Sequence, residues 1–203
     1  MSILVFALIA GYLIGSVPFA LVIGKVFYKT DVRKFGSGNP GGGNTGRVLG
    51  KRAGLSVMAL DLLKVSAVIW LVKTLGGDDT AIAAGALAAG IGHCFPLFAG
   101  FKGGKAVAAM YGWLFGLFAF AGRSPLYFFL PLCVFMIVLY LGRMTSLSSI
   151  VSSIAVTIYI WLQPESMPVK IVQIIFAVLI VIRHRSNLDR IRNHNENKIS
   201  WMP

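Results

Sequence analysis

The stretch ILVFALIAGYLIGSVPFALVI, from Ile3 to Ile23, contains 21 consecutive residues without a charge. At about 1.5 Å of rise per residue, a helix of this length crosses the hydrocarbon core of a bilayer, which is about 30 Å thick. Lys25 and Lys29 follow the stretch, and no basic residue precedes it. Because a cleavable signal peptide carries its basic residues first, we expect a retained transmembrane helix with its N-terminus outside.

The composition extends this interpretation to the whole chain. Of the 203 residues, 57% are hydrophobic and 13% are charged, and the mean hydropathy is +0.79. A soluble domain carries about 25% charged residues, so a water-soluble globular protein is excluded, as is a disordered chain. The two cysteines, Cys94 and Cys133, lie in apolar runs, which excludes a disulfide scaffold and a cysteine-based zinc module.

Further apolar runs recur along the chain and are separated by short polar segments. Together with the first run they predict an all-α integral membrane protein with seven transmembrane helices, organised as one polytopic domain over residues 1–203. The runs after the first are Ala53–Val72, Ala81–Phe98, Ala106–Gly122, Pro125–Gly142, Leu147–Leu162 and Val169–Ile182.

The basic residues decide the topology. The net charge is +12, but the Lys and Arg residues occupy the gaps between apolar runs, which argues against a nucleic-acid binder. Seven spans place 15 basic residues on one side and 3 on the other, so the richer side, including the C-terminus, is predicted to be cytoplasmic. An alternative has five spans with residues 81–122 dipping in and out as a hairpin. We favour seven spans because of this charge asymmetry.

The first long polar loop reads FGSGNPGGGNTGR, from Phe35 to Arg47, with six glycines in thirteen positions. Glycines allow backbone N–H groups to converge, and converging N–H groups beside an arginine predict an anion-binding nest. A flexible linker is the alternative, and Asn39, Pro40 and Asn44 favour a fixed shape. The loop satisfies G-x-G-x-x-G without a preceding strand and lacks the lysine of a Walker A loop, so neither nucleotide fold is supported.

A second polar segment, GHCFPLFAGFKGGK, runs from Gly92 to Lys105. Its Gly-Gly turn precedes an apolar run, and a helix N-terminus with free N–H groups beside Lys102 and Lys105 predicts a second phosphate-binding corner. The lysines could instead orient the helix at the membrane edge. His93, a lone histidine in an apolar run, is typical of a packing residue as well as of a ligand.

A third polar segment, RHRSNLDRIR, runs from Arg183 to Arg192. If the last helix continues through it, His184 and Asn187 share one face at i, i+3. His184 and Asp189 also spell H-x-x-x-x-D, a pattern of another lipid acyltransferase superfamily. Residues five apart lie about 140° round a helix, so this match is interpreted as a coincidence.

Two further groups are polar residues in apolar surroundings. Ser146, Ser148 and Ser149 precede or begin the sixth run, where helix capping is the simplest role and ligand contact the other. Asp61 and Lys64, three residues apart in the second run, are interpreted as a structural ion pair or as part of a polar cavity.

These segments resemble the bacterial membrane acyl-phosphate:glycerol-3-phosphate acyltransferases, the PlsY family, over nearly the whole chain. The three signatures occur in order: GSGNPG with Asn44 and Arg47, then GH, FP and FKGGK between residues 92 and 105, then RH with Asn187 and Glu196-Asn197-Lys198. The family usually has Ala-Thr before the asparagine of the first signature, and Gly and Thr after the final lysine of the second. The chain departs from this at Gly42, Gly43, Ala106 and Ala109.

The resemblance implies transfer of a fatty acyl group from acyl phosphate to the 1-hydroxyl of glycerol 3-phosphate. The products would be lysophosphatidic acid and phosphate, in the first acylation step of phospholipid synthesis. It further implies a bacterial inner-membrane location with the active site facing the cytoplasm. The implied partners are both substrates, membrane lipid and the soluble enzyme that makes acyl phosphate, and no cofactor or metal is implied.

The resemblance and the polar segments together identify the expected site. Its catalytic residues are expected to be Ser37, Arg47, Lys105, His184 and Asn187. Its substrate-binding residues are expected to be Gly38, Asn39, Gly41, Asn44, His93, Lys102, Gly103, Gly104 and Ser149. The base stays open between His184 and the phosphate of the substrate itself.

Two other functions were weighed. A transporter for an organic phosphate would distribute polar groups across the bilayer and show an internal repeat, whereas here the polar groups gather on one side and we find no repeat. A phosphotransferase of the CDP-alcohol type would need a carboxylate-rich metal site, and the seven acidic residues are not clustered in that way.

Overall fold

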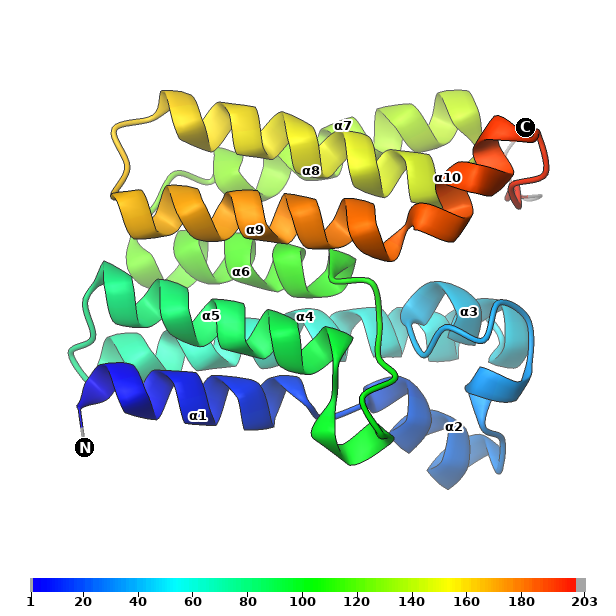
Figure 1. Cartoon of the computed structure of the whole chain (residues 1–203), viewed down its shortest axis with the longest axis horizontal. Coiled ribbons are helices and arrows are strands. Elements are labelled where there is room, and N and C mark those ends of the chain that lie inside the picture. The colour runs from blue at the N-terminus through cyan, green and yellow to red at the C-terminus, as the bar shows by residue number, and fades with distance from the viewer. Residues whose placement is uncertain (1, 200–203) are drawn as a thin grey trace.

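The structure is a computed structural model that describes residues 2–199, and all the regular elements in this part of the chain are helical. The long helices run side by side along the longest axis, with the two ends of the chain at opposite ends of the bundle (Figure 1). These helices are α1 (Ile3–Gly15), α4 (Lys51–Thr74), α5 (Asp79–Cys94), α6 (Val107–Ala121), α7 (Leu126–Gly142), α8 (Thr145–Leu162) and α9 (Met167–Arg183).

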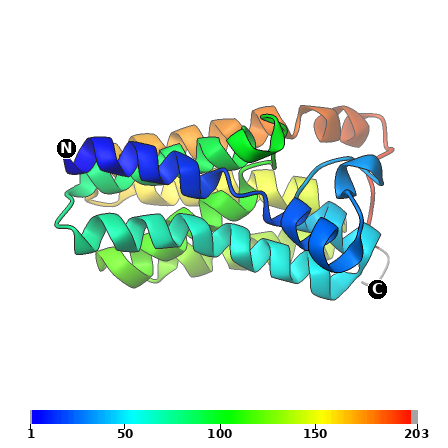
Figure 2. The ribbon, with the colours of Figure 1, turned by 90° about the horizontal axis from the view of Figure 1, so that it is seen from below.

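Shorter helices gather at one end of this bundle, which we call the polar end. They are α2 (Phe19–Tyr28), α3 (Gly42–Leu49) and α10 (Arg185–Arg192), with 3-10 turns at Val32–Lys34 and Leu97–Ala99. A view turned by 90° shows α2, α3 and α10 again at this end, where α2 and α3 lie beside the start of α4 (Figure 2).

Length and composition qualify four segments as membrane spans: Ile3–Tyr28, Lys51–Thr74, Asp79–Ala99 and Thr145–Leu162. The pair α9 and α10 would make a fifth, with a bend of 56° between them. The helices α6 and α7 are apolar but shorter, with 15 and 17 residues. The fold is therefore an all-helical membrane fold, as the sequence predicted.

Two predicted helices are interrupted in the structure. The first run is not one helix, because α1 ends at Gly15 and α2 begins at Phe19, after Pro18. Proline has no N–H to donate and disfavours the helical conformation of the residue before it. The last run is also not continuous with the tail, because His184 separates α9 from α10.

Small residues allow α1 and α5 to pack with their backbones in close approach. A Cβ atom added at Gly11 would lie 2.3 Å from the Gly85 carbonyl oxygen, and one at Gly15 would lie 2.2 Å from the Ala89 carbonyl oxygen. Lipid tails are as apolar as side chains, so such close packing takes the place of the hydrophobic effect in joining membrane helices. The pair α1 and α5 is thereby fixed as a rigid part of the scaffold.

The opposite end of the bundle is closed by an ionic cluster. Arg123, between α6 and α7, lies 2.6 Å from the Asp79 carboxylate at the start of α5 and 3.1 Å from Glu165, between α8 and α9. The Tyr127 hydroxyl donates to the same Glu165 at 2.8 Å. These contacts join three inter-helix connections far from the polar end.

We expect Gly15→Ala to lower the thermal stability of the purified protein, because the new methyl group cannot fit between α1 and α5. Overpacking of this kind costs about 1–3 kcal/mol. The matched control is Gly43→Ala, since a Cβ there meets nothing within 4 Å. Unfolding temperatures in the same detergent provide the measurement, and equal temperatures for the two variants would contradict the packing argument.

Candidate active site

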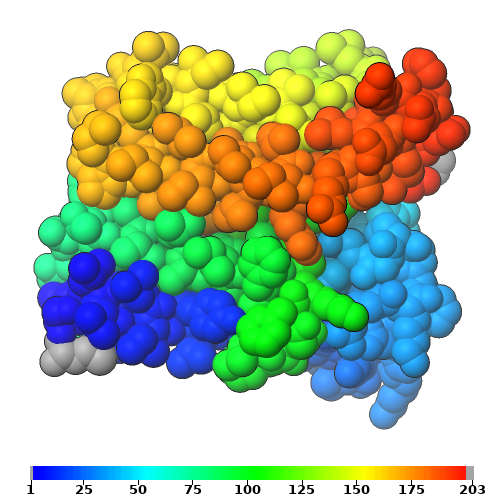
Figure 3. All heavy atoms as spheres, in the orientation of Figure 1, coloured from blue at the N-terminus to red at the C-terminus, as the bar shows by residue number. Residues whose placement is uncertain are grey.

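A cavity of about 690 Å³ lies at the polar end, where three segments distant in sequence meet. The space-filling view shows the first polar loop, the loop before α6 and the red tail converging there (Figure 3). The cavity is lined by Gly36, Ser37, Gly38, Asn39, Pro40, Arg47, Phe101, Lys102, Gly103, Lys105, Arg183, Ser186, Arg190 and Asn197. Five of these side chains are cationic and none is a carboxylate, so the cavity is suited to anions.

The first loop is shaped by Asn44, which is buried inside it. The Asn44 amide accepts from the Ser37 N–H at 2.9 Å and donates to the Val32 and Phe35 carbonyls at 2.9 and 3.1 Å. Gly36 and Gly38 adopt positive φ angles of 58° and 69°, which only glycine adopts readily. Asn44 therefore organises the loop and does not line the cavity.

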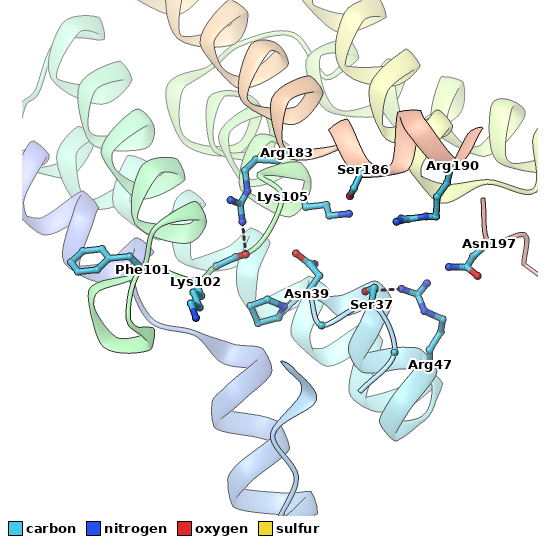
Figure 4. Close-up of a pocket in the computed structure, with 14 residues that line it drawn as sticks. Ser37, Asn39, Arg47, Phe101, Lys102, Lys105, Arg183, Ser186, Arg190 and Asn197 are labelled. Atoms are coloured by element: carbon cyan, nitrogen blue, oxygen red, sulfur yellow. Dashed lines mark hydrogen bonds between the residues drawn. The ribbon is translucent and has the colours of Figure 1, made fainter. Parts of the chain in front are cut away.

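Two backbone N–H groups of the expected nest, those of Ser37 and Gly38, already have partners within the loop. The Gly38 N–H donates to Phe35 O at 3.0 Å, and the Ser37 N–H is bound to Asn44. The loop presents side chains instead, since the Arg47 guanidinium lies 3.4 Å from Ser37 Oγ at the cavity wall (Figure 4). Gly41 precedes α3 as its N-cap residue and is not part of the cavity lining.

In the second expected nest, the two glycine N–H groups are likewise engaged. The N–H groups of Gly103 and Gly104 donate to Cys94 O at 3.2 Å and His93 O at 3.0 Å, because α5 ends there and its last carbonyls need partners. Gly104 is buried behind the wall that Gly103 forms. The loop thus contributes Lys102 and Lys105 rather than free N–H groups.

Arg183 holds the other side of this loop. Its guanidinium donates to the Gly103 and Gly104 carbonyls at 2.8 and 3.0 Å, and it lies over the Phe95 ring at 5.4 Å. Figure 4 shows Arg183 reaching down from the end of α9 to the loop. The sequence analysis did not assign Arg183 to the site, although it stands in the third signature.

A buried carboxylate connects the tail to the cavity. Lys105 Nζ donates to Asn187 Oδ1, and Asn187 Nδ2 donates to Glu196 at 2.6 Å. Ser146 and Arg190 also donate to Glu196, each at 2.8 Å. Burial alone raises the pKa of the Glu196 carboxyl, but these three hydrogen bonds outweigh it and lower the pKa. Sequence reasoning missed Glu196 and Arg190 as site residues, because only the bend after α9 brings them to Lys105.

His184 lies at the bend and is buried. Its Nδ1 is 2.8 Å from Ile180 O, so Nδ1 carries the proton and Nε2 is left as an acceptor. Burial lowers the pKa of His184 to about 4, which keeps the ring neutral at pH 7. Asp189 is exposed and forms no ion pair with His184 among the described residues, so the H-x-x-x-x-D pattern is a coincidence, as predicted.

Two other expected residues lie away from the cavity lining. His93 is buried beneath Gly104, with Nδ1 3.6 Å from the Asp61 carboxylate. Ser149 is buried in α8, where its hydroxyl donates to Thr145 O at 2.8 Å. Their assignment as substrate-binding residues stays a prediction, without a direct opening to the cavity.

The cations of the cavity repel one another. Burial, together with the charges of Arg190, Arg183 and Arg47, lowers the pKa of Lys105 to about 8, while Glu196 acts in the opposite direction. A bound dianion would offset this repulsion. The cavity is therefore electrostatically prepared for a phosphate group.

The fold and this cavity define a class: a helical integral membrane protein with a cationic cavity at one end of its bundle. A family profile described as glycerol-3-phosphate acyltransferase matches residues 5–194. The chain belongs to this family.

Relatives and solved structures agree over nearly the full length. A glycerol-3-phosphate acyltransferase of Enterococcus faecalis is 39% identical, covering 98% of this chain and 93% of the relative, and one of Geobacillus kaustophilus is 40% identical, covering 96% and 95%. The chain is also similar to the crystal structure of PlsY, an integral membrane glycerol 3-phosphate acyltransferase, in its glycerol 3-phosphate form. The two superimpose with a TM-score of 0.90 at 34% sequence identity, and the match covers 98% of this chain and 96% of that chain. Its lysophosphatidic acid form has a TM-score of 0.87 and 33% identity, with the same coverage.

We expect the affinity of the cavity for sulfate to fall with rising pH, with an apparent pKa near 8. Sulfate stays a dianion, so the change reports the loss of the Lys105 proton above its pKa. From about pH 6.5 to about pH 9.5 the affinity should drop at least about tenfold, the scale of one charged hydrogen bond. The sulfate affinity is measured at each pH from the shift in unfolding temperature that sulfate causes.

The control is Lys105→Arg, which keeps its charge over this pH range, so the fall in sulfate affinity should disappear. A pH profile in this variant equal to that of the wild type would contradict the assignment of the titration to Lys105.

Proposed function

We propose that this protein transfers a fatty acyl group from acyl phosphate to the 1-hydroxyl of glycerol 3-phosphate. The cavity with five cationic side chains and no carboxylate in its lining carries this proposal, because both substrates bear phosphate groups. The family membership gives the acceptor, and the acyl phosphate donor is the finer part of the proposal.

The acyl transfer requires little from the protein beyond binding the two substrates and neutralising their phosphate charge. The hydroxyl oxygen attacks the acyl carbonyl carbon, the bond from that carbon to the phosphate oxygen breaks, and inorganic phosphate leaves with the bonding electrons. Acyl phosphate is an activated mixed anhydride, so positioning and neutralisation of the phosphate charge supply much of the rate. Arg47, Lys105 and the Ser37 hydroxyl hold the phosphate oxygens in this scheme.

The hydroxyl proton needs an acceptor in the same step. With a pKa of about 4, His184 is a weak base, whereas a phosphate monoester has its second pKa near 6. We therefore place the proton on the phosphate of a substrate. Asn187, whose amide oxygen accepts from Lys105 and whose amide nitrogen donates to Glu196, positions the Lys105 ammonium group.

We also propose that all seven lengthwise helices span the membrane, with the N-terminus outside and the cavity facing the cytoplasm. The arrangement of α1 and α4–α9 along one axis supports this, as does the asymmetry of 15 basic residues to 3. The bacterial relatives support a location in the cytoplasmic membrane. A cytoplasmic cavity would receive acyl phosphate from the soluble enzyme that makes it, and the acyl chain would lie in membrane lipid.

The alternative of an organic-phosphate transporter finds no support in the arrangement of the cations. Those that line the cavity belong to three segments at the polar end rather than to a path through the bundle. An enzyme site open to one side fits this arrangement better than an alternating-access site at the midplane.

The donor is tested with purified protein and glycerol 3-phosphate, offering acyl phosphate and acyl-CoA in parallel reactions. We expect lysophosphatidic acid only with acyl phosphate, because the leaving phosphate fits the cationic cavity. Arg47→Lys should lower kcat/KM by about tenfold to a hundredfold, since lysine lacks the bidentate fork. Turnover with acyl-CoA alone would overturn the proposed donor.

The topology is tested by labelling single cysteines in a Cys133→Ser background. We expect Lys34→Cys and Phe98→Cys to react with a membrane-impermeant maleimide only from the cytoplasmic side, and Thr74→Cys only from outside. All three side chains are exposed and none lines the cavity. Labelling of the Phe98 position from outside would restore the five-span hairpin.

A further inference from the structure

Three ionisable side chains are buried together beneath the cavity and take no part in the reaction scheme. Asp61 and Lys64 on α4 are 2% and 6% exposed, and His93 on α5 is 6% exposed. Lys64 Nζ lies 2.7 Å from Asp61 Oδ1, and His93 Nδ1 lies 3.6 Å from the same oxygen. We call these residues the buried triad.

Stability alone is a poor reason for the buried triad. A charged side chain inside a membrane helix costs about 2.5–3.5 kcal/mol, and buried ion pairs are often replaced by apolar residues without loss of stability. Such groups within a membrane protein are therefore a sign of function, and their contacts indicate which one.

One contact of the buried triad fixes the break between α1 and α2. Lys64 Nζ donates to Val17 O at 2.9 Å. In a continuous helix this carbonyl would accept from the Leu21 N–H, but that N–H donates to Pro18 O instead. Lys64 thus supplies the partner that the break removes.

The other contact reaches the loop that carries Lys102 and Lys105. A Cβ atom added at Gly104 would lie 2.2 Å from His93 Nε2, so the imidazole packs directly against the Gly104 backbone. His93 O also accepts the Gly104 N–H, while Arg183 binds the Gly104 carbonyl. The loop is therefore held between two side chains: the His93 ring packs against Gly104, and Arg183 binds the Gly104 carbonyl.

We infer that the residues of the buried triad are positioning residues. They fix where this loop lies relative to the cavity, and with it the position of the Lys105 side chain. Asp61 and Lys64 anchor the His93 ring, the ring supports Gly104, and Gly104 precedes Lys105. In this role the triad acts through the loop and not through a contact of its own with substrate. This inference deepens the proposed function and rests on it.

The first test is a double-mutant cycle of Gly104→Ala, His93→Ala and the combined variant. Gly104→Ala should raise KM for glycerol 3-phosphate by about tenfold or more with a change of kcat below about threefold, because the methyl group displaces the loop. His93→Ala should also raise KM. In the combined variant the methyl group occupies part of the vacated space, so KM should lie below that of Gly104→Ala alone. Effects that simply multiply would overturn the inference.

The second test removes the charges without leaving one unpaired. The variant Asp61→Leu with Lys64→Met should still fold, with some loss of thermal stability because Val17 O loses its donor. It should raise KM for glycerol 3-phosphate as His93→Ala does. The control is Asp79→Asn, which breaks an ion pair at the far end and should leave KM unchanged. A wild-type KM in the Leu/Met variant would overturn the inference.

Failure of the donor proposal can be told apart from failure of this inference. If the wild-type enzyme uses acyl-CoA alone, the acyl phosphate proposal fails, yet the KM ratios for glycerol 3-phosphate still report on the loop. Thermal shifts with glycerol 3-phosphate give the same ranking of variants without any donor. If the variants differed only in unfolding temperature without ligand, and not in their affinity for glycerol 3-phosphate, the triad would be merely structural. That result would overturn its positioning role.

Discussion

The requirement that backbone polar groups be satisfied within a membrane shapes every part of this molecule. Helices satisfy their own N–H and C=O groups, so breaks are tolerated only where other partners exist. Here the breaks after Gly15, Cys94 and Arg183 all face the polar end. At two of these breaks, freed carbonyls accept from functional segments: Val17 O from Lys64, and His93 O and Cys94 O from the Gly104 and Gly103 N–H groups. At the third break, the buried His184 ring donates to Ile180 O. The site is thus built from the breaks themselves.

Satisfying these carbonyls uses up the N–H groups that would otherwise bind an anion. The cavity consequently relies on charged side chains, and burial together with their mutual repulsion lowers the pKa of Lys105. Glu196 balances part of this charge from behind, through Asn187 and Arg190, without entering the cavity lining. The anion site remains open for a substrate phosphate, while its walls are held by hydrogen bonds that do not involve the substrate.

Much of this organisation could be predicted from the sequence. Apolar runs located the long helices, and Ser37, Arg47, Lys102 and Lys105 were assigned to a site whose wall they form. The inward turn of Asn44 and the use of the Gly103 N–H were not predicted, because both depend on carbonyls that are distant in the sequence and that the fold brings close. Arg190 was missed for a related reason: a continuous helix was assumed where the chain bends by 56°. The local sequence pattern identifies the helices. The hydrogen-bond partners at the helix breaks depend on the tertiary structure, so the pattern does not reveal them.

The four departures from the usual family pattern can now be placed. None of Gly42, Gly43, Ala106 and Ala109 lines the cavity. Gly42 packs so closely that a Cβ would lie 2.2 Å from Met58, whereas Gly43 faces open space. Ala106 adopts a φ of 64°, a conformation that favours the glycine usual in the family, and such strain costs about 1–3 kcal/mol. The departures therefore affect local stability beside the site, and they leave the cationic side chains of the cavity lining unaltered. Under the proposed function the substrate class depends on those side chains, so these four residues have no direct contact through which to change the substrate.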